Sequence, residues 1–371
     1  MMMMIFKKRT KIGALFIFLF VFFYIQMVCL YRSYYKEIKY IEQISMVASI
    51  GVNKAEITKY EIVTDSFFNF FPSRITLQNI YRKGPFPLNS EYMNDIIDYV
   101  RDVFDYNCKK EAEVVNFIIS DPTHNLLRQH IREKYGMNDN DNYSPSDTES
   151  GNVYHCFLFS IGYRDDVALN QQVDYEAYIH KDIIRVPILD EYRETAHKII
   201  LTLYLLDRMN HSFKYALKSD DDIFLRINKI IPDLRKLGKK HVFIGHKIVG
   251  AIPIRNNTHK WFVDEKDYPG DIYNPYLNGP CYIMRRSIIR DVSIAHYNTT
   301  LIPMEDIHIS YLVSGLGYDL TDSPHYYHCL HFIFCKNSYI VDVGRNLFRR
   351  NYIWKRLKKD FITEQKIRNI W

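Results

Sequence analysis

Residues 213–225 read FKYALKSDDDIFL, and this stretch decides the fold class. Its first part, 213–218 (FKYALK), is predicted to be a buried strand, and it leads directly into Asp220, Asp221 and Asp222. In open α/β sheets, ligands bind beyond the carboxyl ends of the strands. The stretch therefore predicts a buried strand that carries three carboxylates to a ligand-binding edge.

Strand-like and helix-like segments alternate around this stretch. Short apolar runs predict strands at 114–120, 153–160 and 182–189, and helical spacing predicts helices at 123–135 and 191–209. Alternation of this kind is typical of α/β domains. The sequence therefore predicts an α/β domain with a mostly parallel sheet flanked by helices.

The N-terminal part of the chain lacks this alternation. Residues 12–31 form an apolar run after the basic residues of 1–11, and about 20 helical residues span a bilayer core. The run is longer than that of a cleaved signal peptide and has no small-residue cleavage site, so we expect a transmembrane signal-anchor with residues 1–11 in the cytosol. Prolines and glycines interrupt 32–107, which predicts a partly ordered stem before a folded domain at 108–371.

Cysteines and glycosylation signals beyond the anchor favour a luminal location. Disulfides are permitted there, and an odd number of cysteines leaves at least one thiol free or paired between chains. The cysteines are Cys108, Cys156, Cys281, Cys329 and Cys335, and the N-x-S/T sites are Asn142, Asn210, Asn256 and Asn298. We expect Asn142 to be poorly used, because Pro145 follows its site.

The composition is that of a folded protein with a sizeable core, at 47% hydrophobic and 25% charged residues. The net charge is only +6 and long Lys/Arg runs are absent from the sequence, which gives no nucleic-acid-binding signature. Aromatic residues make up 15% of the chain. This content suits either carbohydrate binding or core packing combined with a Phe-rich membrane segment.

The aspartate cluster is the sharpest chemical feature of the sequence. Adjacent carboxylates repel one another, so burying them without a cation is costly. Alternate residues of an extended chain point the same way, so Asp220 and Asp222 can face one ligand while Asp221 faces elsewhere. Oxygen ligands suit Mg²⁺ or Mn²⁺, and the spacing does not fit an EF-hand loop. The alternative is a solvated acidic turn.

Two further segments hold candidate site residues. Glu305 and Asp306 open a helical pattern. They either complement the helix dipole or place a general base in a cleft. The turn-rich aromatic segment 271–282 is either an ordinary surface loop or a wall for a sugar acceptor.

In order and spacing, these segments resemble the β-1,3-galactosyltransferase family (glycosyltransferase family 31) over residues 108–314. Residues 128–132 (RQHIR) resemble its R-x-x-I-R segment, and 190–198 resemble its D-x-Y-x-N-L-T-x-K stretch. Residues 273–282 resemble Y-P-x-Y-x-x-G-x-G-Y, and 305–307 resemble E-D-V. Each motif alone is modest, but the ordered set is specific.

The resemblance implies a GT-A type nucleotide-sugar-binding fold and an inverting transfer from a UDP-sugar. It implies that Asp222, supported by Asp220, binds Mn²⁺ (or Mg²⁺) bridging the donor diphosphate. It also implies that Asp306, beside Glu305, deprotonates the acceptor hydroxyl. Other implied contacts are Arg128, Arg132, Lys218 and Asp221 with the donor, and Trp261, Tyr273, Tyr276 and Gly279 with the acceptor. Arg128 and Arg132 have an alternative as ordinary surface charges on a helix.

Three departures from the family pattern stand out. Glu194 replaces an Asn, and Cys281 replaces a Gly. The His that often completes the family's metal site, about eleven residues before a Trp, is missing before Trp354. The non-Asp metal ligand is then His325, His328, His331 or water, and zinc bound by these histidines beside Cys329 is a further alternative.

These observations lead to a functional hypothesis: a single-pass type II Golgi membrane protein with a luminal catalytic domain. It would transfer a hexose, with galactose ahead of N-acetylglucosamine and N-acetylgalactosamine, from a UDP-sugar to a glycan on protein or lipid. The alternative is a non-catalytic Golgi partner or chaperone of active glycosyltransferases. A luminal sulfotransferase should carry a phosphosulfate-binding loop, and no G-x-x-x-x-G-K pattern occurs. The acceptor, the disulfide pairing and homo- or hetero-oligomerisation stay open.

Overall fold

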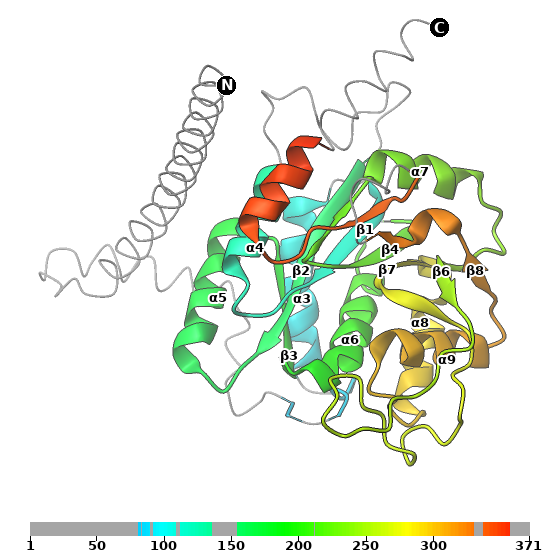
Figure 1. The fold of residues 1–371 in the computed structure, drawn as a ribbon. Helices are drawn as coiled ribbons and strands as arrows, with labels where there is room; N and C mark the ends of the chain where they lie inside the picture. The colour runs from blue at the N-terminus through cyan, green and yellow to red at the C-terminus, as the bar shows by residue number, and fades with distance from the viewer. Residues whose placement is uncertain are drawn as a thin grey trace, which may run out of the picture. The chain divides into compact units, whose positions relative to one another are not determined.

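The computed structural model describes residues 81–82, 84–89, 92–108, 112–135, 154–210, 212–329 and 337–356 (Figure 1). The predicted cytosolic tail, the predicted anchor and most of the predicted stem lie outside the described residues, as do Asn142, His331 and Cys335. In the described part of the chain, no helix combines the length and apolar character needed to cross a membrane.

Strands and helices alternate through the first half of the described chain, as predicted. The strands are β1 (Ala112–Ile119), β2 (Tyr154–Tyr163), β3 (Ile183–Leu189), β4 (Tyr215–Asp220), β5 (Ile223–Leu225), β6 (Phe243–Ile248), β7 (Tyr276–Arg285), β8 (Leu320–Asp322), β9 (His328–Cys329) and β10 (Ile340–Asp342). The helices are α3 (Met93–Asn107), α4 (Asn125–Tyr135), α5 (Val167–His180), α6 (Thr195–Asp207), α7 (Ile227–Lys236), α8 (Arg286–Tyr297) and α9 (Glu305–Gly315), with short 3-10 turns η2 (Tyr192–Glu194) and η3 (Pro324–Tyr326).

The main sheet has the order β3-β2-β1-β4-β7-β6-β8. Its β3-β2-β1-β4 half is parallel throughout, whereas β7 runs antiparallel to both β4 and β6. The prediction of an α/β domain with a mainly parallel sheet is confirmed. The antiparallel β6–β7 pair was not predicted.

Helices cover both faces of this sheet. Along β1, Val115 and Phe117 belong to the core beneath α3, α6, α8 and α9, while Ile118 on the other face packs with α4 and α5. The alternation follows from the period of two in a strand, and apolar residues on both faces explain why the strand reads as a continuous apolar run.

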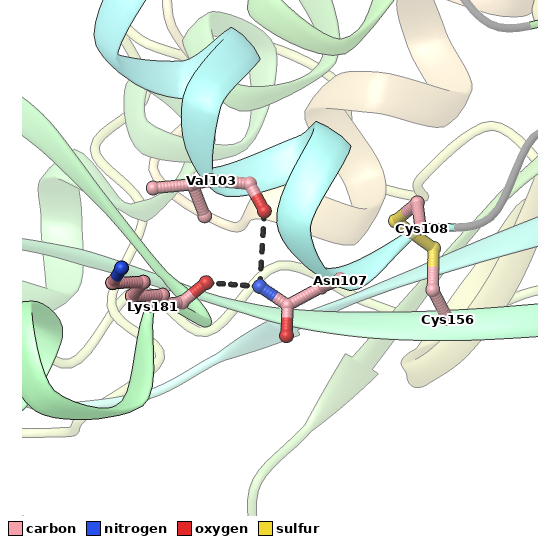
Figure 2. The surroundings of a disulfide bond; sticks show 5 residues. All are labelled: Val103, Asn107, Cys108, Cys156 and Lys181. Atoms are coloured by element: carbon pink, nitrogen blue, oxygen red, sulfur yellow. Dashed lines mark hydrogen bonds between the residues drawn. A yellow bond between two sulfur atoms is a disulfide. The ribbon is translucent and has the colours of Figure 1, made fainter.

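Helix α3 corrects the predicted boundary between stem and folded domain. Ile96, Val100 and Phe104 are fully buried in the main core, so the domain begins before residue 108. Cys108, directly after α3, forms a disulfide with Cys156 near the start of β2 (Figure 2). Beside it, the Asn107 side-chain amide donates to the carbonyl oxygens of Val103 and Lys181 (Figure 2). Segment 32–107 therefore includes a structural helix at its end.

A second, three-stranded sheet has the order β5-β10-β9. Strand β10 pairs antiparallel with β5, with Asp342 opposite Ile223. The amides of Val343 and Gly344 then donate to the carbonyl oxygen of Asp222, each at 3.0 Å. This small sheet therefore brings a C-terminal segment against the aspartate cluster.

Candidate active site

The three aspartates lie at the carboxyl end of β4, as predicted. Asp220 pairs with Ile119, so the cluster is adjacent to the segment that follows β1. Asp221 turns away from its neighbours: its Oδ2 accepts a hydrogen bond from Ser120 Oγ (2.7 Å) and lies 2.8 Å from His124 Nδ1. Although burial opposes the shift, these two contacts hold the pKa of Asp221 below its usual value. Asp221 therefore anchors the turn in its ionised form.

Asp222 has a different environment. Its carboxylate makes no hydrogen bond or ion pair with the other described residues. Burial, followed by the negative charges of Asp221 and Asp342, raises the pKa of Asp222. A carboxylate in such surroundings is stabilised by a cation, so the solvated-turn alternative does not describe this residue.

Lys218 joins the aspartate cluster to Glu305. Its ammonium group donates to Asp220 Oδ1 (2.7 Å), Glu305 Oε1 (2.8 Å) and the carbonyl oxygen of Gly279 (2.6 Å). Although burial opposes it, the two carboxylates raise the pKa of Lys218, which stays charged. Tyr282 donates its hydroxyl to the other oxygen of Glu305 at 2.9 Å. Lys218 therefore bridges two segments that lie far apart in the sequence.

Asp306 begins helix α9 beside this bridge. Its Oδ2 accepts from the amide of Gly279 (3.1 Å) and its Oδ1 from the amide of Ile307 (2.9 Å). Burial, followed by the charge of Glu305, raises the pKa of Asp306 to about 7. A carboxyl that titrates near neutrality has the property of a general base, whereas complementing the helix dipole would favour the charged form.

Gly279 allows the close approach of these carboxylates. A Cβ atom at this position would lie 3.1 Å from Asp306 Oδ2 and 3.3 Å from Glu305 Oε1, tighter than ordinary contact. Its carbonyl oxygen faces Lys218 and its amide faces Asp306. Gly279 was predicted to contact the acceptor, and the structure assigns it the alignment of the two carboxylates.

Three tyrosines, Tyr192, Tyr273 and Tyr276, feel the charge of Asp306. Tyr276 has its pKa raised to about 12 by burial and then by the Asp306 carboxylate, which places the two groups near each other. Tyr273 packs edge-on against Tyr276, with 6.2 Å between ring centroids. Trp261 is 52% exposed, and its interaction with Tyr192 partly offsets the raised pKa of that tyrosine. The predicted aromatic residues are thus brought to one region.

Tyr192 belongs to this region and was not among the predicted site residues. Burial and then the Asp306 carboxylate raise the pKa of Tyr192 to about 12, and the Lys260 ammonium lies 4.5 Å from its ring centroid. It lies in η2, about 110 residues before Asp306 in sequence. Only its place in a motif, beside Glu191, could have indicated it.

Arg128 and Arg132 are both paired with acidic residues outside their own helix. Arg128 is fully buried, and its guanidinium contacts Glu176 (2.9 and 2.6 Å), Ser120 Oγ and two carbonyl oxygens. Arg132 pairs with Glu176 and with both oxygens of Asp182. Every nitrogen atom of both guanidinium groups takes part in a hydrogen bond, so neither residue is a surface charge. The donor contact predicted for Arg128 and Arg132 stays a prediction. Glu176 was missed because it lies 44 and 48 residues away.

Of the three predicted histidines, the structure describes His325 and His328. His328 Nε2 lies 3.5 Å from Asp342 Oδ2, and His325 Nδ1 contacts the carbonyl oxygen of Asn337 at 3.0 Å. Among the described residues, no three His, Cys, Asp or Glu side chains converge to hold a metal ion. Cys329 is disulfide-bonded, which removes the thiolate that a zinc site would need.

The remaining predicted sites are on the surface or in the core. Asn210, Asn256 and Asn298 are exposed, as glycosylation requires. Cys281 is buried and is the free cysteine among the described residues, which agrees with the expectation of an unpaired thiol.

Comparison with known proteins places this site within a family. A model of the Galactosyltransferase family matches residues 127–324, more than half of the chain. Beta-1,3-galactosyltransferase 1 of Mus musculus is 29% identical over 215 residues, covering 57% of this chain and 63% of the relative. Beta-1,3-galactosyltransferase 5 of Gorilla gorilla gorilla is 23% identical over 246 residues, covering 66% of this chain and 79% of the relative.

The alignment thus spans somewhat less than two thirds of the first of these relatives. A solved glycosyltransferase involved in glycosylation of the major capsid of PBCV-1 aligns with 65% of this chain and 98% of its own, at a TM-score of 0.34 and 12% identity. That likeness is too low to carry an argument. The matched range includes every candidate residue from Arg128 to Asp306, and the chain belongs to the galactosyltransferase family.

Proposed function

We propose that this chain is an inverting hexosyltransferase that moves a sugar, galactose first among the candidates, from a UDP-sugar to a hydroxyl of a glycan. The observation that carries the proposal is the bridge from Asp220 through Lys218 to Glu305, because it links the aspartate cluster to the residue beside Asp306. The family match supports a nucleotide-sugar donor. The GT-A architecture, the UDP carrier and the identity of the sugar are parts of this proposal.

Asp306 would act as the general base. With its pKa at about 7, it is ionised in a useful fraction near neutral pH and still basic enough to accept a proton. The acceptor hydroxyl would give its proton to the Asp306 carboxylate while its oxygen attacks the anomeric carbon. The bond from that carbon to the phosphate oxygen breaks and UDP leaves. One displacement from the opposite face gives inversion.

The amide of Gly279 and the ion pairs of Lys218 would hold this base and its neighbour in place. Tyr192, Tyr276 and Trp261 would present ring faces and hydroxyls to the sugars. Positioning of this kind accounts for a large share of catalysis in displacement reactions.

The proposal includes a divalent metal, Mn²⁺ or Mg²⁺. Asp222, with a carboxylate that has no partner among the described residues, fits this role, and Asp220 would support it. When bound, such an ion neutralises the charge of the leaving diphosphate. Lys218 donates a hydrogen bond to Asp220 at 2.7 Å, so this carboxylate would be oriented before the donor arrives.

We further propose a Golgi membrane location with the described domain in the lumen. The apolar run at 12–31 supports an anchor, and the Cys108–Cys156 disulfide supports an oxidising compartment. A glycan on protein or lipid would be the acceptor there.

The test is a measurement of UDP release by the full-length chain with a panel of UDP-sugars and mixed glycan acceptors. We expect acceptor-stimulated turnover with one donor, present with Mn²⁺ and abolished by EDTA. An Asp306→Asn variant should lose about 100-fold or more of the rate, as expected for a missing general base. Asp319→Asn, the same change at an exposed position, should keep the rate. A folded protein that releases UDP from none of these donors would contradict the proposal.

A further inference from the structure

Three buried histidines from three helices form a continuous chain of contacts. His197 in α6 places its Nδ1 at 2.7 Å from Nε2 of His296 in α8. His296 in turn places its Nδ1 at 2.8 Å from Nε2 of His308 in α9. All three are at most 4% exposed. His197 lies 99 residues before His296 and His308 lies 12 residues after it, so the sequence contains no motif that indicates these contacts.

Each end of the histidine chain has a defined partner. The backbone amide of Ile302 donates to His308 Nδ1 at 3.2 Å. At the other end, His197 Nε2 lies 3.5 Å from Glu194 Oε2, which also accepts from the amide of Gly84 at 3.3 Å. One end is therefore a donor that cannot reverse, and the other is a carboxylate that accepts when ionised.

These two ends dictate the direction of every hydrogen bond between them. Because Ile302 donates, His308 Nδ1 must accept, and its single proton lies on Nε2. His308 then donates to His296, and His296 donates to His197. His197 directs its Nε2 proton toward Glu194. Three neutral imidazoles carry three protons, which match the three contacts still to be filled.

None of the three rings can bind an additional proton without breaking this pattern of hydrogen bonds. It would leave two donors facing each other at one contact, whichever ring accepted it. Other facing groups are the Glu194 carboxylate and Tyr297, whose ring lies 5.4 Å from that of His296 and whose hydroxyl donates to the carbonyl oxygen of Phe86. Burial, followed by His308 and His197, lowers the pKa of His296 to about 2. The three histidine rings therefore stay neutral throughout the physiological pH range.

The histidine chain connects the two elements that flank Asp306. His308 lies in the first turn of α9, where its own amide donates to the carbonyl oxygen of Met304, and Glu305 and Asp306 begin the same turn. Glu194 ends η2, which carries Tyr192 at its first residue. Separating α9 or α8 from its neighbour in the histidine chain would break a buried hydrogen bond, which costs about 1–3 kcal/mol.

We propose that His308, His296 and His197 are positioning residues that hold the first turn of α9, and with it Asp306, in a fixed relation to η2. The inference rests on the proposed function for its catalytic consequence. It also accounts for Glu194, which replaces the Asn of the family pattern. An amide can present either a donor or an acceptor, whereas an ionised carboxylate only accepts and so fixes the chain from its second end.

The direct test is ¹⁵N NMR of the histidine rings in the full-length chain, selectively labelled, between pH 5 and pH 8. All three rings should be neutral with the proton on Nε2, and none should titrate in this range. A ring with its proton on Nδ1, or one that titrates near its ordinary pKa, would overturn the inference. This measurement does not depend on activity or on any variant.

The kinetic test compares His296→Leu with the control His155→Gln. His155 also has a buried ring nitrogen, but it lies near the start of β2, at the opposite end of the sheet from the aspartates. We expect kcat of the folded His296→Leu protein to fall about 10- to 100-fold with little change in KM for the donor, because the base is misplaced while the donor site stays intact. His155→Gln should keep both constants. Unchanged kcat in His296→Leu would refute the positioning role, whereas a wild-type protein without any transfer would refute the proposed function instead.

Discussion

Burial raises the pKa of Asp306, so ionising this carboxylate lowers the free energy of unfolding. Its pKa rises to about 7, so above that pH the folded state holds an ionised carboxylate in unfavourable surroundings. At about 1.4 kcal/mol per pKa unit, the cost to the folded state is at most about 4 kcal/mol. The proposed general base thus weakens the structure that holds it, as is common at active sites.

Replacing Asp306 by Asn should therefore stabilise the protein while it inactivates it. The variant has no carboxyl to ionise, so we expect a higher free energy of unfolding at pH 8, by roughly 1–4 kcal/mol. The gain should shrink as the pH falls through 7, because the wild-type group then becomes protonated in the folded state. Urea unfolding of the full-length chain at pH 8 and pH 5 measures this, with Asp319→Asn as the exposed control. Equal or lower stability at pH 8 would show that Asp306 is not held in unfavourable surroundings.

At the scale of elements, the disulfide ties α3 to the sheet. It joins Cys108 and Cys156, which are 48 residues apart, with 5.2 Å between their Cα atoms. Closing a loop of this length restricts the unfolded chain by about 4 kcal/mol in the chain-entropy model. Cys108→Ala should lower the free energy of unfolding by about 2–4 kcal/mol, and Cys156→Ala should do the same.

The double variant is the control for this prediction, with each stability measured by urea unfolding without reductant. Removing either sulfur already breaks the bond, so Cys108→Ala/Cys156→Ala should be no less stable than either single variant. Losses that add up would mean that each cysteine contributes through its own packing and not through the bond.

The same scale shows which parts of the structure the sequence could predict. Strands β1 to β4 were predictable because each is an apolar run buried on both faces, and β3 is buried along its whole length. The carboxylates of Glu305 and Asp306, the proposed catalytic pair, were indicated by their position at the start of a helical pattern. The order of the strands and the antiparallel β6–β7 pair depend on long-range contacts, which local patterns do not contain.

Buried polar networks were also beyond prediction. Arg128 and Arg132 carried a motif that suggested phosphate contact, yet their partners Glu176 and Asp182 lie on other elements. The histidine chain brings together residues 99 and 12 positions apart. The sequence shows that such residues are present, while the pairing that decides their role arises only on folding.

At the scale of the whole molecule, the side of the membrane on which the domain lies decides whether it can reach a luminal glycan acceptor. The described domain offers exposed sequons at Asn210, Asn256 and Asn298, on three separate segments. Asn256 already has its side-chain oxygen held by the amide and hydroxyl of Thr258, at 3.1 and 2.9 Å. Exposure is what modification in a lumen requires, so these sites can report on the compartment.

We predict three N-glycans on the full-length chain when it is expressed in cells with a secretory pathway. Removing Asn210, Asn256 and Asn298 one at a time, each as Asn→Gln, should raise the electrophoretic mobility by one step per site, and an endoglycosidase should reproduce the sum. Asn142→Gln should leave the mobility unchanged, because Pro145 follows that site. The glycosylated domain should also resist protease in intact microsomes and lose this protection with detergent. A chain that carries no glycan and is cleaved without detergent would place the domain in the cytosol. A luminal glycan acceptor could not then be its substrate, even if the purified protein were active.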